Sequence, residues 1–194
     1  MTKIKICGIK TKQDIDIVNA YLPDFIGFVF VPASKRYVTS SQAKDLKQNL
    51  KKEIKAVGVF QNADKKTIAQ AVNLGIIDVI QLHGEEDQEY IDSIRSLKCP
   101  IIKAYKIKDK VSVFLKSDYM LLDNYKGGSG QSFDWSLIDF DMSNVFLAGG
   151  IDISNIQKAK ALKPYCIDIS SFVETNGKKD EIKIKEIIKA VRNG

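Results

Sequence analysis

Short runs of apolar residues recur along the chain and alternate with longer segments in which the apolar residues keep a helical spacing. Several runs, such as residues 25–30, show no alternation of apolar and polar side chains, which is typical of strands buried on both faces. The runs predict eight strands: Lys3–Cys7, Phe25–Phe30, Ile54–Phe60, Val79–Leu82, Pro100–Ala104, Tyr119–Leu122, Asn144–Leu147 and Cys166–Ile169.

The segments between the strands predict helices, because their apolar residues would form one stripe against a sheet. The stripe is clear at residues 15–22, 43–50 and 184–191. It is weak in the fifth segment, around Lys110–Lys116, and in the sixth, where only Trp135–Phe140 is available.

A strand followed by a helix, repeated eight times with no break in composition, predicts an α/β fold. The predicted fold is a closed (βα)8 TIM barrel that forms a single domain over residues 1–194. The alternative is a doubly wound open sheet, which usually has fewer strands and a glycine-rich fingerprint after the first one. Only Cys7 and Gly8 follow the first strand here, so the barrel is favoured.

The charge balance bears on possible partners. The chain has 30 basic and 24 acidic residues, a net charge of +6 and an isoelectric point near 9.0. All but three of the basic residues are lysines, and they are spread along the chain. Because specific nucleic-acid readers rely on arginine and on clustered basic stripes, we expect no nucleic-acid partner. The alternative, a non-catalytic basic binding module, would bind DNA tightly and in a salt-dependent manner.

No apolar run approaches the roughly 18 residues that would predict a membrane span. The first strand pattern begins within a few residues of the N-terminus, which leaves no room for a signal peptide. We therefore expect a cytoplasmic protein without a membrane partner, present as a monomer or a homodimer.

The cysteines argue against a disulfide framework or a zinc site. Cys7, Cys99 and Cys166 are odd in number, widely spaced and without a CxxC pair. In a barrel, Cys99 and Cys166 would lie at the opposite strand ends from Cys7, so the cysteines and the single histidine could not converge on a metal. Cys99 and Cys166 are interpreted as small buried apolar residues.

The chemistry of a TIM barrel lies where its strands end, so the residues just past each predicted strand are the candidates for a site. Most of them are polar or glycine. They are Cys7, Ser34, Arg36, Asn62, His83, Lys103 or Tyr105, Asp123, Gly149, Gly150, Ser170 and Ser171.

Cys7, Asp123 and His83 carry the groups best suited to catalysis. Cationic neighbours at the rim would lower the pKa of Cys7, so that it could act as a base or nucleophile; its alternative role is a core filler. Partial burial would raise the pKa of Asp123 and make it a proton donor; alternatively it forms a turn or a helix cap. His83 either orients a substrate or is a hydrogen-bonded structural residue.

Glycine and hydroxyl residues follow the last three predicted strands, as "GGSG", "AGG" and "DISS". Such segments surround phosphate with backbone N–H groups, and barrels often bind phosphate between the seventh and eighth loops. Tight turns without a ligand are the alternative interpretation.

Taken together, these stretches resemble phosphoribosylanthranilate isomerase, a tryptophan-pathway barrel enzyme. The match runs from the first strand to the last helix. The motifs that carry it are KICGIK, GFVFVPASKRYV, VGVFQN, QLHGEE, LLD with GGSGQSFDW, LAGGI, and DISSFVE followed by GKKD.

The resemblance implies a cofactor-independent and metal-free enzyme of tryptophan biosynthesis, an intramolecular oxidoreductase of the aldose-ketose isomerase type. Its reaction is the Amadori rearrangement of N-(5'-phosphoribosyl)anthranilate to 1-(2-carboxyphenylamino)-1-deoxyribulose 5-phosphate, so the partner is a small phosphosugar. By resemblance, Asp123 matches the general acid that protonates the ribose ring oxygen. Cys7 matches the general base that removes the proton from C2, and Arg36 matches the residue that pairs with the anthranilate carboxylate.

The remaining site residues also follow from the resemblance. Gly149, Gly150, Ser170 and Ser171 match the phosphate-binding region. His83 belongs to a family motif and is assigned a neighbouring role in substrate binding.

The chain departs from the family pattern in the loop after the eighth strand. The family usually has Ser-Ser-Gly-Val-Glu, whereas residue 172 is Phe in this chain. Glycine tolerates a positive φ and a close approach to phosphate, and phenylalanine does not. We therefore expect a rearranged loop, with phosphate contacts shifted toward Ser171 or the seventh loop.

Another phosphosugar-binding TIM-barrel enzyme is the alternative enzymatic function. An indoleglycerol-phosphate synthase would need a catalytic Lys and Glu at the inner strand ends, and a histidine-pathway isomerase would need a pair of Asp residues. Because Cys7 stands at the end of the first strand, the histidine-pathway alternative is disfavoured.

Overall fold

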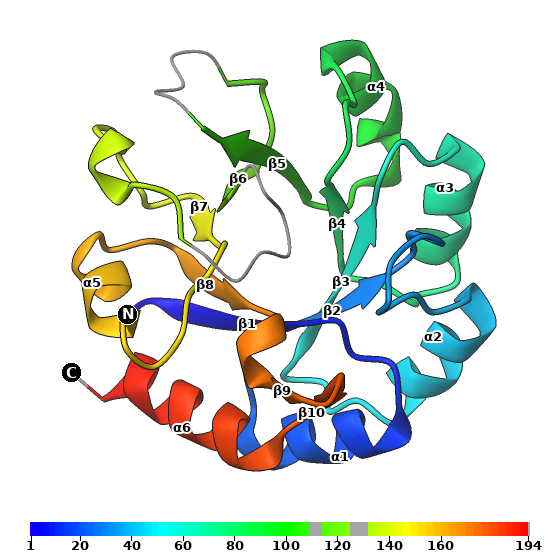
Figure 1. Cartoon of the computed structure of the whole chain (residues 1–194). Coiled ribbons are helices and arrows are strands. Elements are labelled where there is room, and N and C mark those ends of the chain that lie inside the picture. The colour runs from blue at the N-terminus through cyan, green and yellow to red at the C-terminus, as the bar shows by residue number, and fades with distance from the viewer. Residues whose placement is uncertain (109–113, 125–131, 194) are drawn as a thin grey trace.

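The computed structural model describes residues 1–108, 114–124 and 132–193. Eight parallel strands pair in sequence order and close into a barrel, as predicted (Figure 1). β1 pairs with both β2 and β8, so the barrel has no free sheet edge. The strands are β1 (Lys3–Cys7), β2 (Phe25–Val29), β3 (Lys55–Phe60), β4 (Val79–Leu82), β5 (Ile101–Ile107), β6 (Tyr119–Asn124), β7 (Val145–Leu147) and β8 (Cys166–Ile169).

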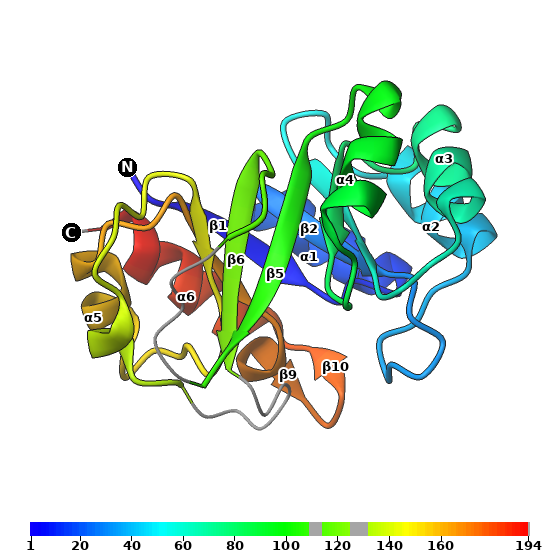
Figure 2. The same ribbon diagram turned by 90° about the horizontal axis from the view of Figure 1, so that it is seen from above.

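Helices surround the barrel on its outside (Figure 1). A short antiparallel hairpin, β9 (Glu174–Thr175) with β10 (Lys178–Lys179), follows β8. In Figure 2 this hairpin lies on the same side of the barrel as the loop that follows β2. The helices are α1 (Lys12–Tyr21), α2 (Ser40–Gln48), α3 (Lys65–Asn73), α4 (Gln88–Ile94), α5 (Ile156–Ala161) and α6 (Glu181–Arg192), with 3-10 turns η1 (Arg95–Leu97), η2 (Trp135–Leu137) and η3 (Ser171–Val173).

Capping residues define where the first two helices begin. The Thr11 hydroxyl accepts from the backbone N–H of Asp14, and the Asp14 carboxylate accepts in return from the backbone N–H of Thr11. Thr39 and Gln42 form the same reciprocal pair at α2. Two otherwise unpaired N–H donors are satisfied at each helix start, which sets the path of the chain after β1 and β2.

Two strands extend further than predicted. β5 continues to Ile107 and β6 to Asn124, because their backbones keep pairing beyond the apolar residues, with Lys106 opposite Asp123. An apolar run shows which residues of a strand are buried. It does not show where the strand ends, because backbone pairing continues into the polar residues at the rim.

The two weakest helix predictions have different outcomes. In the sixth segment only η2 (Trp135–Leu137) forms, so the prediction of a helix over Trp135–Phe140 is wrong. In the fifth segment residues 110–113 lie outside the described residues, and residues 114–116 are not helical.

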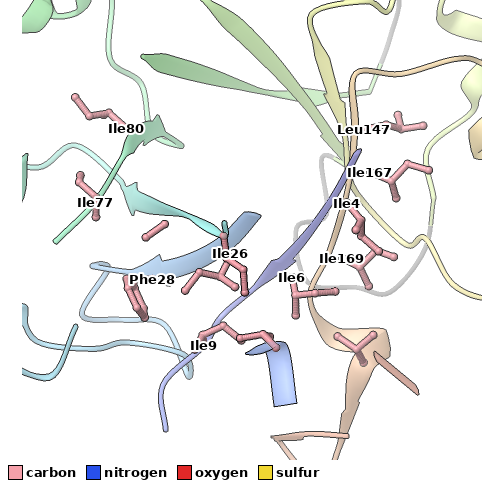
Figure 3. Packing of buried hydrophobic residues seen from close by; sticks show 14 of the residues in the cluster. Ile4, Ile6, Ile9, Ile26, Phe28, Ile77, Ile80, Leu147, Ile167 and Ile169 are labelled. Atoms are coloured by element: carbon pink, nitrogen blue, oxygen red, sulfur yellow. The ribbon is translucent and has the colours of Figure 1, made fainter. Parts of the chain in front are cut away.

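Side chains on the two faces of the barrel form two separate apolar clusters. The larger cluster fills the space between the barrel and the helices and includes Ile4, Ile6, Ile26 and Ile169, seen in Figure 3. The smaller one lies inside the barrel and includes Val57, Ile102, Leu121 and Phe146. Successive strand residues therefore point alternately outward and inward, and both faces are buried.

A buried polar layer lies above the inner apolar cluster. Lys5 is 0% exposed, and its Nζ donates to Asp168 Oδ2 at 2.7 Å and to Gln81 Oε1 at 2.8 Å. Lys5 and Asp168 are register partners on the adjacent strands β1 and β8. Burial alone would lower the pKa of Lys5, but the Asp168 carboxylate together with nearby Cys7 outweighs it and holds the pKa above its ordinary value.

Replacing Lys5 by Met tests the contribution of this ion pair. The change leaves the Asp168 carboxylate without its partner, so we expect a loss of about 3 kcal/mol in the free energy of unfolding. Urea unfolding followed by circular dichroism measures it, with the exposed Lys55→Met on β3 as the matched control. Equal stability of both variants and the unsubstituted chain would show that the pair contributes nothing.

Candidate active site

A cavity of about 410 Å³ opens at the carboxyl ends of the barrel strands. The eight residues that the resemblance assigns to the site all line it. They are Cys7, Arg36, His83, Asp123, Gly149, Gly150, Ser170 and Ser171.

The two-residue period of the strands explains why these side chains converge. Cys7 follows the inward-facing Lys5 by two positions, and Asp123 follows the inward-facing Leu121 in the same way. Each is the last inward position of its strand, so its side chain lies above the inner core and faces the cavity. β1 and β6 are not neighbours in the barrel, so the thiol and the carboxyl approach the cavity from different sides.

The thiol of Cys7 is held in a tight space. A Cβ atom at Gly27, its partner on β2, would lie 2.6 Å from Sγ, so only glycine leaves room for the thiol there. Burial raises the pKa of Cys7, and the Lys5 ammonium beneath it only partly opposes this. The expectation that cationic neighbours would lower the pKa of Cys7 is therefore wrong for the free protein, because desolvation of the thiolate is the larger effect.

Asp123 is fixed by backbone contacts on one side and faces a histidine on the other. Its Oδ1 accepts from the backbone N–H of Asn124 at 2.8 Å, and its Oδ2 lies 3.4 Å from Nε2 of His83. Gly149, with a φ of +82°, passes so close that a Cβ atom there would lie 2.8 Å from Oδ1. A side chain at residue 149 would displace the carboxyl, so glycine is required by space as well as by φ.

Arg36 is clamped by the loop after β8. Its Nε and Nη2 donate to the two carboxylate oxygens of Glu174 at 2.7 and 2.8 Å, and Lys179 Nζ donates to Oε1 of the same carboxylate at 2.8 Å. Burial would raise the pKa of Glu174, but these hydrogen bonds outweigh it and hold the pKa below its ordinary value. The guanidinium thus has a fixed position at the edge of the cavity, and a carboxylate occupies only one of its edges.

The seventh and eighth loops form the glycine and serine side of the cavity. Gly149 and Gly150 both have positive φ values, and Asn155 Nδ2 donates to the carbonyl of Gly150 at 2.8 Å. Ser170 Oγ donates to the carbonyl of Cys7, which ties the eighth loop to the end of β1. The "GGSG" segment after β6, residues 127–130, lies outside the described residues.

Phe172 lines the same cavity without backbone strain. It lies in the 3-10 turn η3, it does not have a positive φ, and it packs against the outer apolar cluster. The loop therefore accommodates a phenylalanine where the family usually has glycine.

Comparison with known proteins identifies the family. A family model described as "N-(5'phosphoribosyl)anthranilate (PRA) isomerase" matches residues 4–190. The N-(5'-phosphoribosyl)anthranilate isomerase of Endomicrobium trichonymphae is 44% identical over 200 residues that cover 100% of both chains. The chain belongs to the phosphoribosylanthranilate isomerase family. Its members are isomerases of tryptophan biosynthesis, as the resemblance implied.

Solved structures of the isomerase family have the same fold. The phosphoribosyl anthranilate isomerase of Thermus thermophilus superposes with a TM-score of 0.90 at 28% identity, over 98% of each chain. A phosphoribosyl anthranilate isomerase in complex with reduced 1-(o-carboxyphenylamino)-1-deoxyribulose 5-phosphate superposes with a TM-score of 0.84 at 31% identity, over 99% of each chain.

Three candidates at the rim of this isomerase-family barrel do not line the cavity. Instead, the buried Glu86 carboxylate accepts from the buried Lys103 Nζ and from the backbone N–H of Asn62, whose side chain is exposed. Tyr105 points outward and packs against Phe114. Lys103 and Tyr105 were wrongly predicted because they lie at outward positions of β5, which contributes Lys106 to the cavity instead. Asn62 was wrongly predicted because it lies in the loop after β3, where its Oδ1 accepts from the backbone N–H of Glu85.

Sequence reasoning missed the polar floor of the isomerase-family site. Gln81 and Asp168 line the cavity above Lys5, and Asp168 Oδ1 is a buried atom without a hydrogen-bond partner among the described residues. The signal was present, because each is a polar residue that interrupts an apolar strand at an inward position, two residues before a predicted site residue.

Other findings concern metals, membranes and the remaining cysteines. Over residues 1–108, 114–124 and 132–193, no three His, Cys, Asp or Glu side chains are placed to hold a metal ion. Within the same described residues, no helix has the length and apolar character needed to cross a membrane.

Cys166 is buried, as expected, whereas Cys99 is half-buried. Burial raises the pKa of Cys99 to about 11.

The raised pKa of Cys7 predicts its reactivity in the free protein. At neutral pH the thiolate fraction is smaller than that of an ordinary cysteine, so the rate of alkylation by iodoacetamide should still be rising with pH at about 8.5, the usual thiol pKa. Mass spectrometry of the peptide containing Cys7 measures this rate separately from the rates of Cys99 and Cys166. A rate that levels off near neutral pH would mean a lowered pKa.

Proposed function

We propose that the protein catalyses the Amadori rearrangement of N-(5'-phosphoribosyl)anthranilate to 1-(2-carboxyphenylamino)-1-deoxyribulose 5-phosphate. The observation that carries the proposal is that a thiol and a carboxyl, Cys7 and Asp123, line one cavity from non-adjacent strands. A family member with a reduced form of this product bound supports the substrate class.

The reaction needs one proton donated and one removed at different atoms of the same sugar. The Asp123 carboxyl protonates the ribose ring oxygen while the C1–O bond breaks and the anthranilate nitrogen forms a protonated Schiff base at C1. The Cys7 thiolate then takes the proton from C2, and the electrons of that bond neutralise the nitrogen and give an enolamine. The enolamine gains a proton at C1 and loses its hydroxyl proton at O2 to give the ketone, so no atom is gained or lost overall.

The raised pKa of Cys7 suits a base that acts only on bound substrate. In the free protein the buried site favours the neutral thiol. The protonated Schiff base is a cation formed within the cavity, and an adjacent cation favours the thiolate, so the thiol releases its proton to solvent water before the thiolate takes the proton from C2. The Lys5 ammonium below Cys7 acts in the same direction.

Arg36 is positioned to receive the anthranilate carboxylate. A guanidinium has five N–H donors, and Glu174 takes one edge of it, through Nε and Nη2. The other edge remains for a second carboxylate, and the Glu174 clamp holds it in place before the substrate binds.

The phosphate is assigned to the side of the cavity formed by the seventh and eighth loops. Gly149 and Gly150 leave the backbone of the seventh loop without side chains to obstruct it, and Ser170 and Ser171 add hydroxyl groups and backbone N–H groups from the eighth loop. The net charge of +6 also favours the approach of a substrate with two anionic ends.

Removal of either acid–base group should reduce turnover strongly while the fold is kept. Cys7→Ala and Asp123→Asn should each lower kcat by about 100-fold or more, because each removes a proton-transfer group. The change in anthraniloyl fluorescence on mixing with freshly made phosphoribosylanthranilate measures the rate. Cys99→Ala and Asp16→Asn, which lie outside the cavity, are the matched controls. Full activity of either cavity variant would remove that residue from the mechanism.

Loss of the Arg36 guanidinium should weaken recognition of the anthranilate end. Arg36→Met removes a charge-assisted hydrogen-bonded pair, so we expect kcat/KM to fall by about 10-fold or more. Steady-state kinetics measures the change, and Arg95→Met, at the exposed start of η1, is the control for loss of an arginine. An unchanged kcat/KM would mean that Arg36 does not contact the substrate.

A further inference from the structure

A line of polar contacts crosses the floor of the cavity from β1 to β6. Lys5 Nζ donates to Gln81 Oε1 at 2.8 Å, and Gln81 Nε2 lies 2.9 Å from Nδ1 of His83. Nε2 of the same imidazole lies 3.4 Å from Asp123 Oδ2. Lys5 determines which group is the donor and which is the acceptor in each of these hydrogen bonds.

Lys5 can act only as a donor. It is 0% exposed, it is paired with the Asp168 carboxylate at 2.7 Å, and an ammonium group has three N–H donors and no acceptor. The group that faces Lys5 from β4 must therefore be the carbonyl oxygen of the Gln81 amide, not its NH2 group.

This contact fixes the orientation of the Gln81 amide. With Oε1 turned toward Lys5, the NH2 group is turned toward His83. An amide NH2 group donates and cannot accept, so Nδ1 of His83 must be the acceptor of this hydrogen bond. A proton on Nδ1 would set two donors against each other at 2.9 Å.

We propose that Gln81, held by Lys5, is a positioning residue that keeps His83 in the tautomer with its proton on Nε2. The imidazole then presents an N–H group, not a lone pair, to the carboxyl group of Asp123. The contact is longer than a good hydrogen bond in the free protein, and such contacts often shorten when substrate binds.

The chemical consequence rests on the proposed function. When Asp123 gives its proton to the ring oxygen it becomes a carboxylate, and an N–H donor beside it stabilises that charge. The other tautomer would place the lone pair of Nε2 against the carboxylate and oppose the transfer. His83 therefore supports the acid without supplying the proton.

The tautomer can be read directly, because His83 is the only histidine of the chain. We would label the protein with [15N]histidine and record two-bond 1H–15N correlation spectra without substrate at about pH 8, above the range in which an ordinary imidazole titrates. The proposal predicts a protonated, pyrrole-like Nε2 and an unprotonated, pyridine-like Nδ1. A mixture of tautomers, or the proton on Nδ1, would overturn it. Because no substrate is needed, this result stands even if the protein proves not to be the proposed isomerase.

Two substitutions test whether Gln81 sets the tautomer. Gln81→Glu places an acceptor opposite Nδ1 and should move the proton there, whereas Gln81→Met removes the bias and should give a mixture. Gln70→Glu, the same change on the exposed part of α3, should leave the spectrum unchanged. A spectrum with the proton still on Nε2 in both Gln81 variants would overturn the assignment of this role to Gln81.

Kinetics of the same variants gives the link to catalysis. We expect kcat of Gln81→Met to fall by about 10-fold, the lower end of the effect seen when the partner that orients a metal-binding histidine is removed, with a much smaller change in KM. Gln70→Glu should retain full activity. A fall in kcat with the tautomer unchanged would show that Gln81 acts on catalysis by another route and would contradict the proposed one.

Discussion

The buried ammonium of Lys5 is the group on which the arrangement of the site depends. It forms the register-matched ion pair with Asp168 that joins β1 to β8, it lies beneath the thiol of Cys7, and it orients the amide of Gln81 toward His83. An unpaired charge at this depth would be strongly destabilising, so the position of Lys5 is determined by its partners. The polar floor of the cavity is consequently a fixed array, and the groups that face the substrate are held by it.

The inside of the barrel is divided into two parts with different physical roles. The lower part is apolar and aromatic, with Phe25, Phe146 and Tyr165 packed within 6.4 Å of one another between ring centroids. The upper part holds the polar floor and the cavity above it. Two glycines provide space for the reactive groups at the cavity. Gly27 leaves room for the thiol of Cys7, and Gly149 leaves room for the carboxyl of Asp123.

Much of this arrangement could be predicted from the sequence, and the misses have physical reasons. Strands buried on both faces appear in the sequence as continuous apolar runs, so the number and order of these runs predicted the barrel. The polar residues that follow the runs predicted which side chains lie at the carboxyl ends of the strands. Apolar runs do not show where backbone pairing stops, which is why β5 was predicted to end at Ala104 and Lys103 was wrongly assigned to the rim. Apolar runs also do not show whether burial or nearby charge has the larger effect on a pKa, so the pKa of Cys7 was wrongly predicted to be lowered. The Glu174 clamp on Arg36 joins residues 138 positions apart and has no local signal.

We infer that Cys7 and Asp123 act on one sugar from two sides of a single cavity. A crystal structure of this protein with reduced 1-(o-carboxyphenylamino)-1-deoxyribulose 5-phosphate bound would test it most directly. We expect the Cys7 thiol to lie against C2 of the ribulose chain and the Asp123 carboxyl to lie within hydrogen-bond distance of the hydroxyl derived from the former ring oxygen. We expect the phosphate to lie at Gly149, Gly150, Ser170 and Ser171. A bound analogue that leaves either the thiol or the carboxyl out of contact with the sugar would contradict it.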